Sequence, residues 1–147
     1  NISSQILFKA MDQKDLIPEI VGMFQKEVAE RVVSPPGSKK YGIISVLVQS
    51  YYDVEYLFTV DETVFDPSPK VKSAVILLRR NDRDKLECDK KKFIQLVKTA
   101  FGQRRKTLRN ALKSLNLVDE NTASQYLSLR AEQLSVEDFM NLTACFE

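Results

Sequence analysis

The hydrophobic periodicity of this chain changes once, near residue 80, and that change constrains the fold more than any other feature. Before it, segments with helical spacing alternate with short segments rich in β-branched and aromatic residues. This alternation is typical of an α/β layer. The charged segment 79–85 marks a boundary, because only helical spacing follows it. We therefore predict an α/β part at residues 1–80 and an all-helical domain at residues 81–147.

Three segments of the first part are predicted strands. Residues 19–24 form a nearly continuous apolar run, as in a buried parallel strand, whereas residues 54–60 alternate and residues 71–78 are strongly β-forming. Helical spacing fills the intervals, with apolar positions at Ile6, Leu7, Ala10, Met11, Val28, Ala29, Val32, Val33, Ile44, Leu47, Val48 and Tyr51. Ser3 or Ser4 is the expected cap of the first helix, and Pro35-Pro36-Gly37 ends the second.

A sheet of about three strands is narrow for an α/β domain with helices on both faces. It leaves a long unpaired edge, which we place at residues 19–24, and we expect self-association of the chain through this edge. The chain also starts directly on a predicted helix with no strand before it. We therefore expect it to be the C-terminal part of a larger α/β domain.

The helical part has clear start and stop signals. Asp89 is a predicted N-cap, and Gly102 is expected to break or bend the helix that follows. A second helix continues from Leu108 to Leu115, and Ser135 with Asp138 fits the capping box of a last helix. The apolar positions of these helices are Phe93, Leu96, Val97, Ala100, Phe101, Leu108, Ala111, Leu112, Leu115, Val136, Phe139 and Met140.

Composition excludes several kinds of site. The chain has no histidine, which removes Ser-His and Cys-His nucleophile pairs and most catalytic zinc sites. None of its four glycines forms a G-x-G loop after a strand, so we expect no bound nucleotide cofactor. Cys88 and Cys145 match no metal or redox spacing, so we expect free thiols and no metal. The longest apolar runs fall far short of the ~20 residues that span a bilayer, and no leader opens the chain, so we expect a cytoplasmic protein without membrane contact.

The distribution of charge says more than the net charge of +2. Residues 90–118 contain no Asp or Glu, and their cations are Lys90, Lys91, Lys92, Lys98, Arg104, Arg105, Lys106, Arg109 and Lys113. A basic segment of this kind suits an anionic partner. We place Arg104, Arg105 and Lys106 near the first turn of a helix, facing phosphate.

Residues 64–75 carry the most specific motif. Pro67 and Pro69 hold an extended loop and fix Phe65 at the end of the preceding strand. From the residues alone, this segment is a rigid connection with Phe65 as a core plug. It also resembles the F-x-P-x-P-K-V-x-S-A-V pattern of the rRNA adenine dimethyltransferases and their antibiotic-resistance relatives. In those families the phenylalanine is associated with stacking of the flipped target adenine, so the resemblance implies that role for Phe65, Pro67 and Pro69.

Further segments resemble the same family in the same order. Residues 1–4 look like the continuation of its N-L-P-Y catalytic motif, which would lie just before Asn1. Residues 25–31 resemble Q-K-E-V-A-x-R, residues 37–42 resemble G-S-K-x-Y-G, and residues 130–135 match R-A-E-Q-L-S. Residues 100–110 resemble the C-terminal signature of the family and contain the basic cluster.

The resemblance implies a methyltransferase that uses S-adenosylmethionine to dimethylate two adjacent adenosines of small-subunit rRNA during ribosome biogenesis. Because the sulfonium methyl group is already activated, no histidine base is needed; the enzyme must extrude and place the base. The fold implied is the C-terminal part of a Rossmann-like methyltransferase sheet, followed by a small helical domain that binds rRNA in the pre-30S particle. The implied rRNA contacts are Gln103, Arg104, Arg105, Lys106 and Arg109, with Lys26 and Arg31 as weaker candidates that Glu27 and Glu30 can pair.

This chain alone is expected to be inactive and to bind no S-adenosylmethionine, since the cofactor loop and N-L-P-Y are outside it. Two alternatives stay open. The first is a non-catalytic RNA-binding or ribosome-assembly module that uses the basic helices alone. The second is a 23S rRNA resistance methylase, which the segments at 103–110 and 130–135 disfavour.

Overall fold

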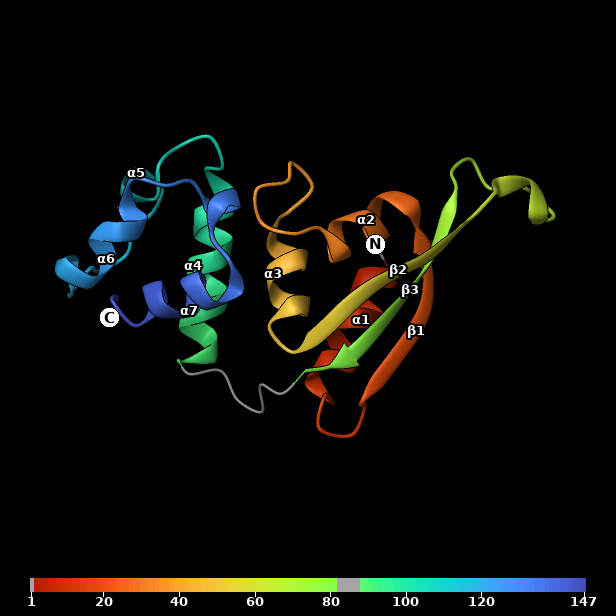
Figure 1. Cartoon of the computed structure of the whole chain (residues 1–147), viewed down its shortest axis with the longest axis horizontal. Helices are drawn as coiled ribbons and strands as arrows, with labels where there is room; N and C mark the ends of the chain where they lie inside the picture. Colours follow the sequence, from red (N-terminus) through yellow and green to blue (C-terminus); the bar gives the residue numbers. More distant parts are fainter. Residues whose placement is uncertain (1, 82–87) are drawn as a thin grey trace. The chain divides into compact units, whose positions relative to one another are not determined.

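The computed structural model describes residues 2–81 and 88–147, and these residues form two compact units. One unit consists of Asn1–Ser34 and Val48–Asp84, and the other of Pro35–Leu47 and Lys85–Glu147 (Figure 1). The inclusion of Pro35–Leu47 in the helical unit was not predicted. The charged segment 79–85 was predicted as a solvated boundary, but Arg79 and Arg80 are the last residues of a strand (Ser73–Arg80), and positions 82–85 lie outside the described residues.

The sheet of the first unit contains β1 (Glu19–Gln25), β2 (Tyr52–Val60) and β3 (Ser73–Arg80) in the order β1-β3-β2. Three strands were predicted at these places, and the mixed α/β fold class is confirmed. The prediction that residues 19–24 form a buried parallel strand is wrong, because β1 pairs antiparallel with β3. β3 also pairs antiparallel with β2, and it lies between two strands that precede it in the chain.

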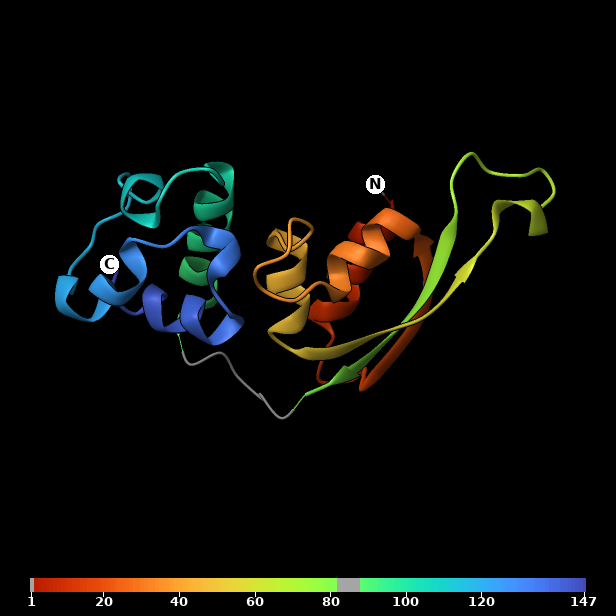
Figure 2. The same ribbon diagram turned by 45° about the horizontal axis from the view of Figure 1, so that its top comes forward.

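One face of this sheet packs against helices. α2 (Lys26–Val33) buries Ala29 and Val32, and α1 (Ile2–Asp12) lies on the same side of the sheet (Figures 1 and 2). The prediction that Ser3 or Ser4 caps the first helix is wrong, since α1 begins at Ile2 and both serines lie within it. The strand side chains on this face are Ile20, Phe24, Ala74, Ile76 and Leu78.

The opposite face of the sheet carries an exposed apolar row in the described part of the chain. Met23 pairs with Val75, and Val75 pairs with Phe58, so these three side chains lie in one row. Met23 is 51% exposed and Phe58 54%, and Val21 on the same face is 59% exposed. β1 is an edge strand, as predicted for residues 19–24, because it has β3 as its only neighbour within the described sheet. Helices on both faces are therefore not found among the described residues.

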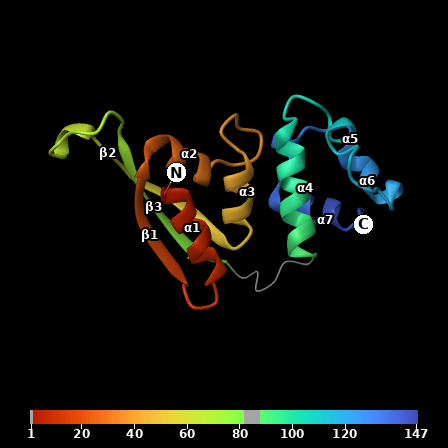
Figure 3. The ribbon, with the colours of Figure 1, turned by 180° about the vertical axis from the view of Figure 1, so that it is seen from behind.

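The second unit is helical, as predicted. α4 (Lys90–Gly102) begins at the predicted cap, where Asp89 Oδ1 accepts a hydrogen bond of 3.0 Å from Lys92 N, and it buries Phe93, Leu96, Val97 and Ala100. It is followed by α5 (Leu108–Ala111), α6 (Glu120–Leu127), the 3-10 turn η2 (Ala131–Gln133) and α7 (Val136–Thr143), which are seen from behind in Figure 3.

The helix boundaries of this unit were predicted with mixed success. α7 has the predicted capping box between Ser135 and Asp138. The predicted helix from Leu108 to Leu115 stops at Ala111, and α6 was not predicted. α6 starts where Asp119 accepts a hydrogen bond from Thr122 N at 3.1 Å. Within the described ranges, no helix has both the length and the apolar content needed to span a bilayer.

α3 (Ile43–Gln49) belongs to both units, because the division of the chain falls after Leu47. Gly37, at the start of the segment that leads to it, has a φ of +91°, a left-handed conformation that glycine adopts without strain. α2 ends at Val33, shortly before this turn, as the Pro35-Pro36-Gly37 sequence predicted.

Candidate functional site

The loop between β2 and β3 carries Phe65 and projects beyond the helices of its unit (Figures 1 and 2). It begins with the 3-10 turn η1 (Glu62–Val64), where Asp61 Oδ1 accepts hydrogen bonds from Thr63 N at 2.9 Å and Thr63 Oγ1 at 2.8 Å. These bonds hold the pKa of Asp61 below its usual value. Ser68 Oγ then donates to Glu62 O at 2.8 Å, which ties the proline segment back to the turn.

Phe65 is half-buried in this loop, while Pro67 and Pro69 are exposed. A core plug would be fully buried, as Phe93 is with 1% exposure. The structure therefore leaves part of the Phe65 side chain accessible to solvent. The conformation of the loop depends on short-range hydrogen bonds and on the prolines, which restrict its backbone.

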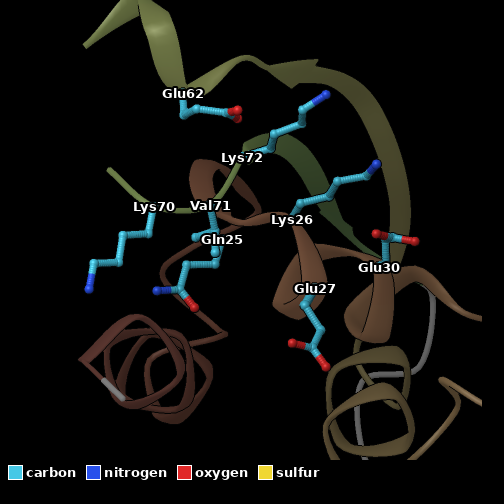
Figure 4. A pocket seen from close by; sticks show the side chains of 8 residues that line it. All are labelled: Gln25, Lys26, Glu27, Glu30, Glu62, Lys70, Val71 and Lys72. Atoms are coloured by element: carbon cyan, nitrogen blue, oxygen red, sulfur yellow. The ribbon is translucent and has the colours of Figure 1, made fainter. Parts of the chain in front are cut away.

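A cavity of about 400 Å³ lies between this loop and the start of α2 (Figure 4). Most of its lining residues belong to two of the sequence segments described above, 25–31 and 64–75. Its lining residues are Gln25, Lys26, Glu27, Glu30, Glu62, Lys70, Val71 and Lys72. The backbone closes one side, because Lys26 N donates to Lys72 O at 2.9 Å. Lys26 therefore lies near Lys70 and Lys72 of the segment 64–75, which were not predicted from the sequence as site residues.

The charges around this cavity are mixed. Three lysines face three glutamates, and Lys72 Nζ lies 3.9 Å from Asp61 Oδ2 on the exposed side. Glu62 Oε2 is buried, and it has no hydrogen-bond partner among the described residues. Arg31, the other basic candidate of α2, pairs with Glu27 at 2.9 Å in an exposed i,i+4 ion pair. An exposed pair of this kind contributes little to stability.

The basic turn at residues 103–106 lies between α4 and α5 and lines a cavity of about 470 Å³ with Phe101 and Gly102. Its cations lie just before α5, near the start of a helix, but α5 begins only at Leu108 and has four residues. The cations also follow the C-terminal end of α4, which has 13 residues. The negative end of a helix dipole stabilises cations at this position.

The members of the turn differ in their surroundings. Gln103, Arg105 and Lys106 are exposed. Arg104 is half-buried, and its Nη2 donates to Lys39 O at 2.7 Å and Ser38 O at 3.1 Å. Arg109, on α5, is exposed and pairs with Glu120 at 3.0 Å.

An aromatic cluster packs beside the turn. Tyr41 meets Phe101 edge to face with ring centroids 6.0 Å apart, and Phe101 lies 5.8 Å from Phe139. The Arg104 guanidinium lies 5.6 Å from the centre of the Phe101 ring, within range of a cation–π interaction. Burial, together with the Asp138 carboxylate, raises the pKa of Tyr41 well above its ordinary value. Tyr41 is therefore a neutral core residue of the helical unit.

None of the four glycines lies in a turn typical of nucleotide-cofactor sites. Such a site needs a glycine-rich turn between the end of a strand and the start of a helix. Gly22 lies within β1, Gly37 follows α2, Gly42 precedes α3 after a loop, and Gly102 ends α4. Across residues 2–81 and 88–147, no three of the cysteine, aspartate and glutamate side chains gather as metal ligands.

Comparison with known proteins explains why these motifs occur together. A family model described as "Ribosomal RNA adenine dimethylase" matches residues 1–147. The chain belongs to this family. It is 59% identical over 143 residues to the ribosomal RNA small subunit methyltransferase A of Cytophaga hutchinsonii, covering 97% of this chain and 55% of that protein. It is 57% identical over 147 residues to the protein of the same name from Flavobacterium johnsoniae, covering 100% of this chain and 56% of that one.

The chain thus spans about half the length of the curated dimethylase relatives it matches. Solved structures support the fold. A dimethyladenosine transferase from Plasmodium falciparum aligns with 99% of this chain and 65% of its own at a TM-score of 0.83 and 23% identity. The 23S rRNA methyltransferase ErmE aligns over 87% of this chain and 54% of its own with a TM-score of 0.58 and 21% identity.

Proposed function

We propose that this chain is the rRNA-binding C-terminal part of an S-adenosylmethionine-dependent methyltransferase that dimethylates N6 of two adjacent adenosines in small-subunit rRNA. The observation that carries the proposal is the match of the whole chain to the dimethylase family, with relatives at 57% to 61% identity. The activity belongs to the longer parent protein, which acts in the cytoplasm on the pre-30S particle. This chain alone is inactive and holds no cofactor.

Phe65 is the residue we assign to the target base. Its side chain is half-buried in a loop that hydrogen bonds hold in place, and the flanking Pro67 and Pro69 are exposed. A base extruded from its stack needs an aromatic face to rest on. Stacking of this kind is worth roughly 1–3 kcal/mol per base. Phe65 and its two prolines therefore hold the flipped adenine, and the bond-making chemistry takes place on parts of the parent outside this chain.

The cations proposed to contact rRNA lie in both units, and each unit supplies its own surface. Lys26 and Arg31 are on α2, and Lys26 lines the cavity beside the Phe65 loop. In the helical unit the proposed contacts are Gln103, Arg104, Arg105, Lys106 and Arg109, which lie at or just before α5. Phosphate contacts from such cations position a protein on RNA without reading its sequence.

Self-association is a separate proposal for this chain. β1 has an unpaired edge within the described sheet, and Val21 and Met23 are exposed beside it. Strand edges of this kind pair with other chains when nothing covers them.

The RNA-binding role is tested by titrating a small-subunit rRNA transcript with the 147-residue chain at several salt concentrations. We expect binding whose log affinity falls linearly with log salt. Arg105→Ala with Lys106→Ala should lower that slope by roughly 0.7–0.9 for each phosphate interaction that the substitutions remove. Lys9→Ala, which removes an exposed cation of α1, is the matched control. Equal slopes for the wild type and the double variant would contradict the assignment.

The catalytic part of the proposal needs the parent gene. If the sequence upstream of Asn1 carries a glycine-rich strand-to-helix loop and N-L-P-Y, the enzyme is favoured. If both are missing from the gene, the chain is a non-catalytic RNA-binding or ribosome-assembly module.

A further inference from the structure

We propose that residues 38–41 complete the basic RNA-binding surface of the helical unit, with Lys39 and Lys40 as additional phosphate contacts. In this arrangement Arg104, which is included above among the rRNA contacts, acts instead as a positioning residue that holds the segment against the turn containing Arg105 and Lys106. The inference rests on the proposed RNA-binding role of the chain and extends it to a segment about 65 residues earlier in the sequence.

The guanidinium of Arg104 is already occupied by protein groups. Its Nη2 donates to the carbonyl oxygens of Ser38 at 3.1 Å and Lys39 at 2.7 Å, and it lies 3.4 Å from Glu132 Oε2. Its Nη1 lies 3.8 Å from the position that a Cβ atom on Gly42 would take. One arginine head group therefore reaches both ends of the segment from 38 to 42.

Other contacts hold the same segment in place. Gly37 N donates to Glu132 O at 2.6 Å, and the Tyr41 ring packs on Phe101. Within the segment, Tyr41 N donates to Ser38 O at 3.2 Å. The backbone of residues 37–41 is thus fixed at both ends by parts of the helical unit. A planar guanidinium suits this task, because its donors are arranged to reach several acceptors at once.

The side chains of Lys39 and Lys40 are exposed on this fixed backbone. Because Arg104 Nη2 donates to the Lys39 carbonyl, the Lys39 backbone lies one arginine side chain away from the backbone of the basic turn. Residues 31–52 contain no Asp or Glu, and Glu132, the acid at this contact, pairs with Arg104. The result is a surface with cations from two segments that themselves contain no acids, which suits a phosphodiester strand.

The test combines Lys39→Ala and Arg104→Lys in a double-mutant cycle on the 147-residue chain, with a small-subunit rRNA transcript as the probe. Lys39→Ala should lower the salt slope of binding by roughly 0.7–0.9, as expected when one phosphate interaction is removed. Arg104→Lys keeps the charge but not the forked donors, so it should release the segment. We expect Lys39→Ala to have no further effect in the Arg104→Lys background, because coupled residues are not additive.

A second measurement reports the positioning directly. Hydrogen exchange at the amide of Tyr41, and tryptic cleavage after Lys39 and Lys40, should both become faster in Arg104→Lys than in the wild type. Lys39 is exposed, so Lys39→Ala leaves the fold intact and remains informative if the arginine variant is unstable. Lys9→Ala serves as the charge-matched control.

The outcomes separate this inference from the proposed function. If Arg105→Ala with Lys106→Ala lowers the salt slope and Lys39→Ala with Lys40→Ala does not, the added surface is wrong and the RNA-binding role stands. If Lys39→Ala has the same effect in both backgrounds and exchange is unchanged, the positioning role of Arg104 is wrong. If the wild-type chain fails to bind the transcript, both proposals fail.

Discussion

Arg104 Nη2 lies 3.4 Å from Glu132 Oε2, and this ion pair joins two sequence motifs that are separated by α5 and α6. The same nitrogen donates to the carbonyl of Lys39, in a third motif. Three of the segments that resemble the dimethylase family therefore meet at one guanidinium. The residues that make these contacts therefore have a structural role, in addition to the RNA-binding role proposed for the basic residues of these segments.

Arg104→Ala should destabilise the helical unit more than Glu132→Gln does. The alanine variant removes the donor of two carbonyl hydrogen bonds and a cation–π interaction, so we expect the free energy of unfolding to fall by about 1–3 kcal/mol. The ion pair itself is partly exposed, with the Arg104 side chain at 33% and Glu132 at 26%, so Glu132→Gln should cost under about 1 kcal/mol. Urea denaturation of both variants checks the order. A larger destabilisation by Glu132→Gln would assign the stability to the ion pair.

Phe65→Ala should lower methylation by the longer parent protein while leaving the salt slope of RNA binding unchanged, since an aromatic face neutralises no phosphate. Because Phe65 is only half-buried, its truncation should cost less stability than the ~3–5 kcal/mol typical of a core phenylalanine. Phe58→Ala, which removes an exposed aromatic from the same hairpin, is the matched control. Normal methylation by folded Phe65→Ala protein would remove the stacking role.

The 147-residue chain should bind no S-adenosylmethionine and transfer no methyl group. The reason is that none of its glycines lies in a strand-to-helix turn. Isothermal titration calorimetry measures this directly. A dissociation constant in the micromolar range would show that a cofactor site exists without such a turn.

The edge of β1 should drive self-association at high protein concentration. Val21→Lys with Met23→Lys places charges on the edge strand, which opposes pairing with another chain, so light scattering should report a smaller mean mass. Leu16→Lys is a suitable control, because Leu16 is 78% exposed and lies in the turn before β1. A monomeric wild type at all concentrations would refute the prediction.

Cys145 should react with iodoacetamide more slowly than Cys88. Burial, and the charge of Asp119, raise the pKa of the Cys145 thiol, so at about pH 8 it carries less of the reactive thiolate than an ordinary cysteine. Cys145 is also only 1% exposed, whereas Cys88 is partly accessible. Mass spectrometry of the labelled peptides gives the two rates. The difference should vanish in urea.

The order and type of most elements could be predicted from the sequence, because their signals are local. Asp89 and the Ser135–Asp138 box mark helix starts through hydrogen bonds within four residues, and both are found. The pairing of β1 was predicted wrongly, since an apolar run does not reveal which strand lies beside it. Its direction depends on the insertion of β3 between two earlier strands.

In the candidate site, too, local features could be predicted from the sequence and tertiary contacts could not. Pro67 and Pro69 restrict their own neighbourhood, so an ordered loop at Phe65 could be predicted from local sequence. The engagement of Arg104 could not, because its partners at Ser38, Lys39 and Glu132 are brought to it by tertiary packing. A run of cations in a sequence does not distinguish a side chain that faces solvent from one that holds a distant loop.

Because Pro35–Leu47 belongs to the helical unit, this unit is built from two separate stretches of the chain. This affects both its folding during synthesis and its transfer between genes. On the ribosome, Tyr41 is synthesised before β2 and β3, and it must wait for Phe101 to emerge before its packing partner exists. A gene fusion that transplants residues 85–147 alone would leave the aromatic cluster incomplete and Arg104 without its carbonyl partners. Recombination at a single breakpoint therefore cannot exchange this unit between proteins intact.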